Sequence, residues 1–89
     1  MAWRIEFERS AERDLAKLDA ETAKRILRFL RDRVSPSDDP PTIGEALKRA
    51  RLGSFWKYRV GDCRVIAAIE AGALRILVVK VGNRREVYR

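Results

Sequence analysis

Two short cationic runs in the second half of the chain contain the side chains best suited to chemistry. In the run Trp56–Val60, strand alternation places Lys57 and Arg59 on one face and the aromatic residues on the other. If Gly61 and Asp62 form a two-residue hairpin loop, Arg59 lies directly opposite Arg64 on the next strand. Like charges in that position destabilise a sheet by up to about 1 kcal/mol. This cost has no structural benefit unless an anion lies between them. Taken alone, however, the pattern also fits an ordinary amphipathic hairpin with solvated cations, and exposed charges usually matter little.

The carboxyl-terminal residues extend this set of candidate side chains. Gly82 closes the last predicted strand, and Arg84, Arg85 and Tyr88 follow it. These residues have little remaining chain against which to pack, which favours a functional role. The pattern alone leaves open whether Tyr88 belongs to a site or fills the core.

The net charge of +7 is confined to one half of the sequence. Residues 1–43 contain nine basic and nine acidic side chains, whereas residues 44–89 contain eleven basic and four acidic side chains. A segregated positive field attracts polyanions through steering and through the release of counterions from phosphates. Charge alone does not separate this interpretation from a basic surface that only aids solubility.

Length and composition exclude several classes of protein. Eighty-nine residues fit one domain, which we expect to span residues 1–89. The single Cys63 cannot form an intramolecular disulfide, and the absence of histidine removes the commonest metal ligand and general base. We therefore expect no metal and no cofactor. The amino terminus lacks the apolar core of a signal peptide, and no stretch approaches the roughly 20 apolar residues of a membrane span, so we expect a cytoplasmic protein.

Two helices and four strands are predicted from residue periodicity. Alternation indicates a first strand at Trp3–Phe7. Ser10 and Asp19 are predicted to cap two successive helices, the second with an apolar stripe from Ala23 to Val34 that includes Leu27. A loop rich in proline follows at Ser35–Pro41. Three further strands are predicted at Phe55–Val60, Cys63–Glu70 and Leu74–Val81.

These elements predict an α+β fold. We expect a small twisted antiparallel sheet of about four strands, with the amino-terminal helical hairpin packed on one face. Strand alternation then directs Trp56 and Tyr58 toward the core and leaves the cations of the same strand outside.

Residues 56–66 (WKYRVGDCRVI) and 81–88 (VGNRREVY) resemble the RelE toxins of the RelE/ParE superfamily of toxin–antitoxin modules. The resemblance covers nearly the whole chain and implies a ribosome-dependent endoribonuclease that cuts mRNA in the decoding site. It also implies inhibition by an acidic, partly disordered RelB-like antitoxin, with which the toxin would form a hetero-oligomer. Many relatives carry His or Lys at the position of Asn83.

The resemblance assigns roles to particular residues. Lys57, Arg59 and Arg64 correspond to cations that bind the phosphate and the transition state, Arg84 to an arginine that assists the leaving group, and Tyr88 to a tyrosine that acts as base or positions the 2′-hydroxyl. Because no histidine is present, cleavage would proceed by attack of the RNA's own 2′-hydroxyl without a metal. The remaining cations of the second half are expected to hold RNA backbone; they are Lys48, Arg49, Arg51, Arg75, Lys80 and Arg85.

Two other functions fit parts of the pattern. A ParE-like toxin of the same superfamily would inhibit DNA gyrase by binding it, without nuclease activity. The joint presence of Lys57, Arg59, Arg64, Arg84 and Tyr88 favours the nuclease. A basic RNA-binding module would need aromatic side chains exposed for stacking, whereas Trp56 and Tyr58 are predicted to face the core.

Overall fold

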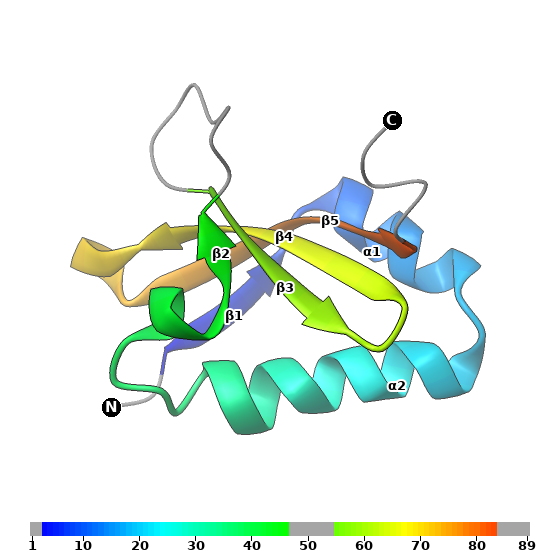
Figure 1. The fold of residues 1–89 in the computed structure, drawn as a ribbon. Coiled ribbons are helices and arrows are strands. Elements are labelled where there is room, and N and C mark those ends of the chain that lie inside the picture. Colours follow the sequence, from blue (N-terminus) through cyan, green and yellow to red (C-terminus); the bar gives the residue numbers. More distant parts are fainter. Residues whose placement is uncertain (1–2, 47–54, 84–89) are drawn as a thin grey trace.

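The computed structural model describes residues 3–46 and 55–83. The helices are α1 (Arg9–Lys17) and α2 (Ala20–Phe29), and α2 continues into a π-helical turn at Leu30–Val34. The strands are β1 (Arg4–Phe7), β2 (Glu45–Ala46), β3 (Phe55–Val60), β4 (Cys63–Glu70) and β5 (Arg75–Asn83), and short 3-10 helices lie at Pro40–Ile43 and Ala71–Ala73. The predicted α+β class and the amino-terminal pair of helices are confirmed (Figure 1).

The sheet contains five strands in the order β1-β5-β4-β3-β2, and it is mixed. Strands β3, β4 and β5 are antiparallel neighbours, as predicted, and β2 adds a further antiparallel pairing to β3. Strand β1 pairs with β5 in parallel, with Ile5 opposite Ile76. The prediction of a wholly antiparallel sheet was therefore wrong at this edge. The two-residue strand β2 was not predicted either. Residue periodicity does not report which strands pair, and the parallel pairing joins segments from opposite ends of the sequence.

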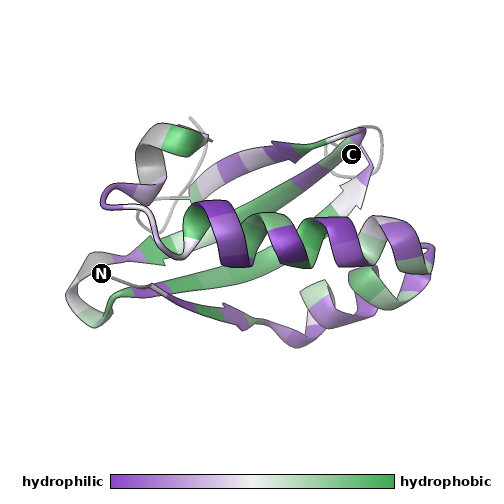
Figure 2. Ribbon diagram, turned by 90° about the horizontal axis from the view of Figure 1, so that it is seen from below, coloured by the Kyte–Doolittle hydropathy of each residue, from purple (hydrophilic) through white to green (hydrophobic). Residues whose placement is uncertain are grey.

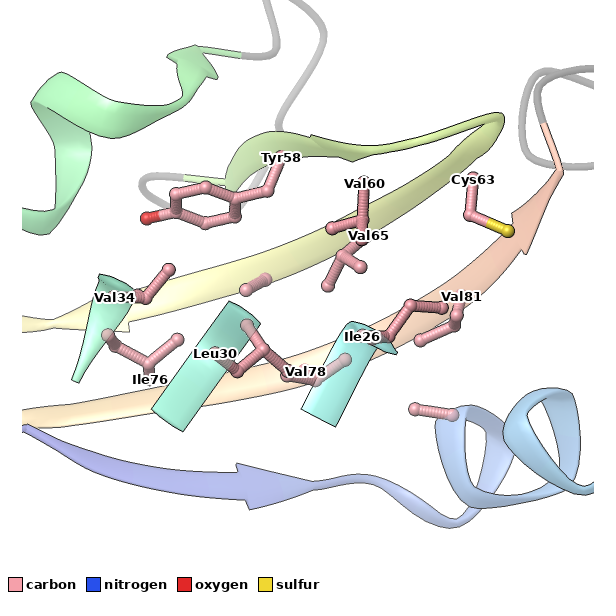
Figure 3. Close-up of a cluster of buried hydrophobic side chains, with 12 residues drawn as sticks. Ile26, Leu30, Val34, Tyr58, Val60, Cys63, Val65, Ile76, Val78 and Val81 are labelled. Carbon is pink, nitrogen blue, oxygen red and sulfur yellow. The ribbon is translucent and has the colours of Figure 1, made fainter. Parts of the chain in front are cut away.

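Helix α2 covers one face of the sheet and forms the core with it. Figure 2 views the molecule from the side of α2 and shows this helix lying across largely hydrophobic strands. Ile26, Leu30 and Val34 of the helical segment are buried against Tyr58 and Val65 of the sheet (Figure 3). Leu27 was predicted to join this stripe, but it is 43% exposed.

The start of α2 follows the predicted capping pattern. The side chain of Asp19 accepts a hydrogen bond of 3.2 Å from the backbone N–H of Thr22 and one of 2.6 Å from the Thr22 hydroxyl. These bonds favour the ionised carboxylate and lower the pKa of Asp19. The cap fixes the point at which the chain turns from α1 into α2.

Helix α1 begins differently from the prediction. It starts at Arg9 after Glu8, and no side chain caps it. Ser10 instead donates a hydrogen bond of 2.9 Å from its hydroxyl to the carbonyl oxygen of Val79. Asp14 accepts a hydrogen bond of 3.0 Å from the backbone N–H of Val81. Strand β1 ends opposite Val78. Beyond that point, Ser10 and Asp14 of α1 bind the backbone groups of β5 that have no strand partner on this edge.

Candidate functional site

The strand register brings four of the predicted site residues together in two neighbouring rows. One row runs across β3, β4 and β5 as Arg59, Arg64 and Gly82. The adjacent row consists of Lys57, Ile66 and Lys80. We call Lys57, Arg59, Arg64 and Lys80 the cation face. Directly opposed residues have Cβ atoms about 5 Å apart, so the Arg59 and Arg64 side chains start as close neighbours, as predicted.

The cation face lies on the side of the sheet that α2 does not cover. Tyr58, Val60, Val65 and Val81 belong to the core cluster under α2. Because side chains alternate along a strand, Lys57, Arg59, Arg64 and Lys80 project from the other face. Tyr58 is fully buried and donates a hydrogen bond of 2.9 Å from its hydroxyl to the Pro40 carbonyl oxygen. It is therefore part of the core and not an exposed ring on which bases could stack.

A β-bulge in β5 places Lys80 on the cation face. Ala67 is opposite Val78, whereas Ile66 is opposite Lys80, so Val79 is the extra residue. Without it, the regular register would direct Lys80 into the core and Val81 outward. The bulge instead sets Lys80 opposite Ile66, next to the row of Arg64. No feature of the sequence around Val79 indicates this shift.

Arg64 is the residue whose environment differs most from that of an ordinary surface cation. Only 6% of it is exposed, and it is the one charged side chain in the buried class among residues 3–46 and 55–83. Its Nη1 donates a hydrogen bond of 3.1 Å to the Cys63 carbonyl oxygen. No carboxylate within the described ranges forms an ion pair with it. A buried guanidinium without a counter-charge is costly, and an anion bound beside Arg59 would lower that cost.

Lys57 contacts a residue that the sequence did not single out. Its Nζ lies 3.3 Å from Oε2 of Glu45, which the strand β2 places directly opposite it. The Glu45 side chain is largely exposed, and such exposed pairs contribute only about 0–1 kcal/mol. An anionic ligand could therefore replace Glu45 at the Lys57 ammonium or bind that ammonium beside it. In the sequence, Glu45 is marked only as the single acidic residue between Ile43 and Lys48, which does not indicate its pairing with Lys57.

Gly44, next to Glu45, lies against the backbone of β3 where a side chain would not fit. A Cβ atom at this position would lie 2.6 Å from the Lys57 carbonyl oxygen and 3.0 Å from the Tyr58 ring. Any larger residue would push the chain away from β3. The glycine thus permits the close approach that pairs Glu45 with Lys57.

Arg75 lies apart from the cation face. Its Nη2 is 2.7 Å from Oε2 of Glu70, and its Nη1 is 2.8 Å from Oε1 of Glu6. These bonds raise the pKa of Arg75 and join β1, β4 and β5. Lys80 is five residues away along β5, roughly 17 Å at the usual rise of a strand. The structure thus gives Arg75 a structural contact and does not bring it to the other predicted site residues.

Several predicted site residues lie outside the described ranges. They are Lys48, Arg49, Arg51, Arg84, Arg85 and Tyr88. The ordered strand end at Val81 to Asn83 leads directly to Arg84. The described part of the site therefore consists of the cation face together with Glu45.

The other reactive groups near the cation face do not add chemistry to it. Cys63 is buried in the core cluster, and this burial raises the pKa of its thiol, which disfavours the reactive thiolate. Within residues 3–46 and 55–83, no group of three or more Cys, Asp or Glu side chains is arranged to hold a metal ion. No helix in those ranges is long and apolar enough to cross a membrane.

The family model of the ParE toxin of type II toxin–antitoxin systems (parDE) matches residues 5–88. The chain belongs to this family. Its fold is also that of the RelE toxins. The RelBE2 toxin–antitoxin complex from Mycobacterium tuberculosis matches with a TM-score of 0.83 and 24% identity, covering 94% of this chain and 93% of the other.

Two further solved structures of RelE toxins share this fold. The RelE–RelB complex from Pyrococcus horikoshii has a TM-score of 0.69 and 22% identity, covering 94% of this chain and 97% of the other. A mutant of Escherichia coli RelE in the free state has a TM-score of 0.74 and 21% identity, covering 99% and 92%. No curated protein gives a significant sequence match. At these identities the structures show the fold, and the ParE family match shows that the chain is a toxin of the RelE/ParE superfamily.

Proposed function

We propose that this ParE-family toxin is an mRNA endoribonuclease that acts on the ribosome and so inhibits translation. The observation that carries the proposal is the buried Arg64 directly opposite Arg59, with Lys57 and Lys80 in the next row. Four cations on one face of a short sheet suit a phosphodiester better than a neutral or cationic ligand.

The proposed reaction uses the RNA's own 2′-hydroxyl as nucleophile. The 2′-oxygen forms a bond to the adjacent phosphorus, the bond from phosphorus to the 5′-oxygen breaks, and a proton passes from the 2′-hydroxyl to the leaving oxygen through groups of the site. The products are a 2′,3′-cyclic phosphate and a 5′-hydroxyl end. Lys57, Arg59 and Arg64 stabilise the negative charge that develops on the phosphorane, which is commonly the largest single catalytic contribution.

Proton transfer is the weaker part of this chemistry. Arg84 and Tyr88 take the roles of acid and base in the proposal. An ordinary tyrosine has a pKa of about 10, so only about 0.1% is ionised at pH 7, and arginine is a poor acid. Alignment of the reacting atoms contributes roughly 7–11 kcal/mol when a rigid partner supplies it. We therefore expect rapid cleavage of mRNA on the ribosome and slow cleavage of naked RNA.

The proposed partners are the ribosome, mRNA and an acidic antitoxin of the RelB type. Support for the antitoxin comes from the family itself and from matched structures that contain a toxin with its antitoxin. The cationic second half of the chain offers a physical reason for an acidic partner.

One experiment separates this proposal from inhibition of DNA gyrase, which the ParE name of the family model favours as a second candidate. Purified toxin is added to ribosomes programmed with a defined mRNA and, in parallel, to gyrase with relaxed plasmid. We expect cleavage with 5′-hydroxyl ends and unchanged supercoiling. Arg59→Gln should cleave about 10²–10³-fold more slowly, whereas Lys17→Gln on α1 should cleave normally. Intact mRNA together with inhibited supercoiling would show that the protein is a gyrase inhibitor and not a nuclease.

A further inference from the structure

A second cationic surface lies on the exposed side of α2, beside the hairpin that carries the candidate site. A groove of about 450 Å³ runs between α2 and the β3–β4 turn. Arg25, Arg28, Arg33 and Arg59 line it, and we call it the arginine groove. Three of these residues come from the first half of the chain, whose net charge is zero. The distribution of charge along the sequence therefore did not predict this surface.

The arginine groove is joined to the candidate site by contact. Gly61, in the turn between Arg59 and Arg64, has φ +59°. A Cβ atom at Gly61 would lie 3.3 Å from Nη1 of Arg25, so the Arg25 guanidinium packs directly against this turn. Arg59 belongs to both surfaces, since it lines the groove and lies opposite Arg64.

The groove carries a nearly uncompensated positive charge. Asp32 is the one acidic residue among those that line it. Arg31, outside the groove, donates a hydrogen bond of 2.9 Å to Asp32, which lowers the pKa of that carboxylate and occupies it. Asp32 also attracts Arg28, more weakly than it attracts Arg31. Within the described ranges no ion pair joins Arg25, Arg28, Arg33 or Arg59 to a carboxylate, so the groove keeps a net positive charge for a ligand.

The shape of the groove suits an extended polyanion. A second hollow of about 270 Å³ shares Arg25 and Arg28 with it and is also lined by Glu21, Thr22 and Lys24. Three of these five residues are basic and one is acidic, so the surface stays net positive toward the start of α2. From Arg25 to Arg33 the helical segment rises roughly 12 Å, which accommodates several phosphates of one strand. Phe29 and Val60 contribute apolar surface, and Phe29 packs its ring edge against Tyr58. Among the described residues that line the groove, Phe29 is the one aromatic side chain and it is half-buried, so contacts to phosphates would dominate and binding would depend little on sequence.

We infer that the arginine groove holds the single-stranded RNA backbone that flanks the cleaved phosphodiester. This inference rests on the proposed nuclease function. The strand leaves the cation face beside Arg59, passes the β3–β4 turn at Arg25 and follows α2. The groove would set the affinity and the direction of the RNA, and Arg25, Arg28 and Arg33 would not take part in the bond exchange.

The test measures binding of a fluorescent 2′-O-methyl oligouridine of 12 nucleotides, which cannot be cleaved, to the full chain at several salt concentrations. Arg25→Gln/Arg28→Gln is the groove variant. The matched control is Arg13→Gln/Lys17→Gln, which removes the same charge from exposed positions of α1. We expect the groove variant to bind roughly tenfold more weakly and its salt slope to fall by about 1.4, or about 0.7 for each lost phosphate contact. The control should keep the slope of the parent chain.

Equal losses in the two variants would overturn the inference, because they would indicate a general field rather than a groove. So would a groove variant that binds the RNA normally but loses a glutamate-rich 12-residue peptide, which would identify an acidic polypeptide as the occupant. The cleavage assay on ribosomes reports separately on the proposed function. If the parent chain cuts no mRNA while the groove variant still loses RNA affinity, the nuclease is wrong and the groove remains an RNA-binding surface.

Discussion

Arg64 is the described residue at which folding stability and the proposed function are expected to conflict most clearly. Its guanidinium is buried with a single backbone acceptor and no carboxylate partner in the described ranges. Replacement of buried charged groups by apolar residues of similar volume is often neutral or stabilising. An apolar substitution at Arg64 should therefore affect stability and activity in different directions, which substitution of an exposed cation would not do.

We predict that Arg64→Met keeps or raises the melting temperature and reduces cleavage on the ribosome by at least about 10²-fold. Thermal unfolding and the rate of mRNA cleavage check the two parts. Lys57→Met is the comparison, because its ion pair with the largely exposed Glu45 contributes little, so the substitution should change the melting temperature little. A large fall in melting temperature for Arg64→Met alone would instead identify Arg64 as a structural residue.

Tyr58 gives a pH-dependent prediction. Burial raises its pKa from 10.0 to about 12, with a smaller contribution from Asp39. Because the neutral phenol is favoured in the folded state, its contribution to stability is complete below pH 10 and is lost as the pH rises through about 12. Urea unfolding of the parent chain and of Tyr58→Phe should show the parent more stable at pH 7, since the bond to Pro40 is kept.

The difference between the two chains should then shrink between pH 10 and 12. The phenylalanine variant has no phenol to ionise at this position, so the remaining tyrosine and the lysines affect both chains alike. An equal difference at pH 7 and pH 11.5 would contradict the raised pKa.

At the scale of elements, the sequence predicted what depends on local periodicity. Alternation in β3 and the two-residue turn at Gly61 and Asp62 correctly placed Arg59 opposite Arg64. The bulge at Val79 could not be predicted, because three successive β-branched or long residues fit either face of the strand. Ser10 was read as a cap because serine is common there, whereas its hydroxyl bonds to a carbonyl 69 residues away.

Helix α1 is predicted to hold the end of β5 in place through Asp14. Removal of its carboxylate in Asp14→Ala would leave the Val81 N–H without its acceptor, which costs about 1–3 kcal/mol in the free energy of unfolding. Asp14→Asn keeps an acceptor and should cost less. Urea unfolding measures the stability, and hydrogen exchange at the Val81 amide should be faster in the alanine variant. Unchanged exchange in Asp14→Ala would show that α1 does not fix this strand end.

At the scale of the whole molecule, two surfaces compete as the principal contact for the proposed antitoxin. One is the positive field of the cation face and the arginine groove. The other is an apolar hollow of about 310 Å³ between β1 and α2, lined by residues that include Trp3, Phe7 and the exposed Leu27. Composition predicted the first surface in part, through the cationic second half. The hollow could not be predicted, because it depends on the parallel placement of β1 at the sheet edge.

The salt dependence of association distinguishes these surfaces. Electrostatic steering acts mainly on the association rate constant and is screened by salt. With an acidic antitoxin, we predict that this constant falls at least about tenfold between 50 mM and 500 mM NaCl while the dissociation rate changes little. Stopped-flow fluorescence of the two tryptophans measures both rates. An association rate that does not vary with salt, combined with faster dissociation in Leu27→Ser, would make the apolar hollow the principal contact.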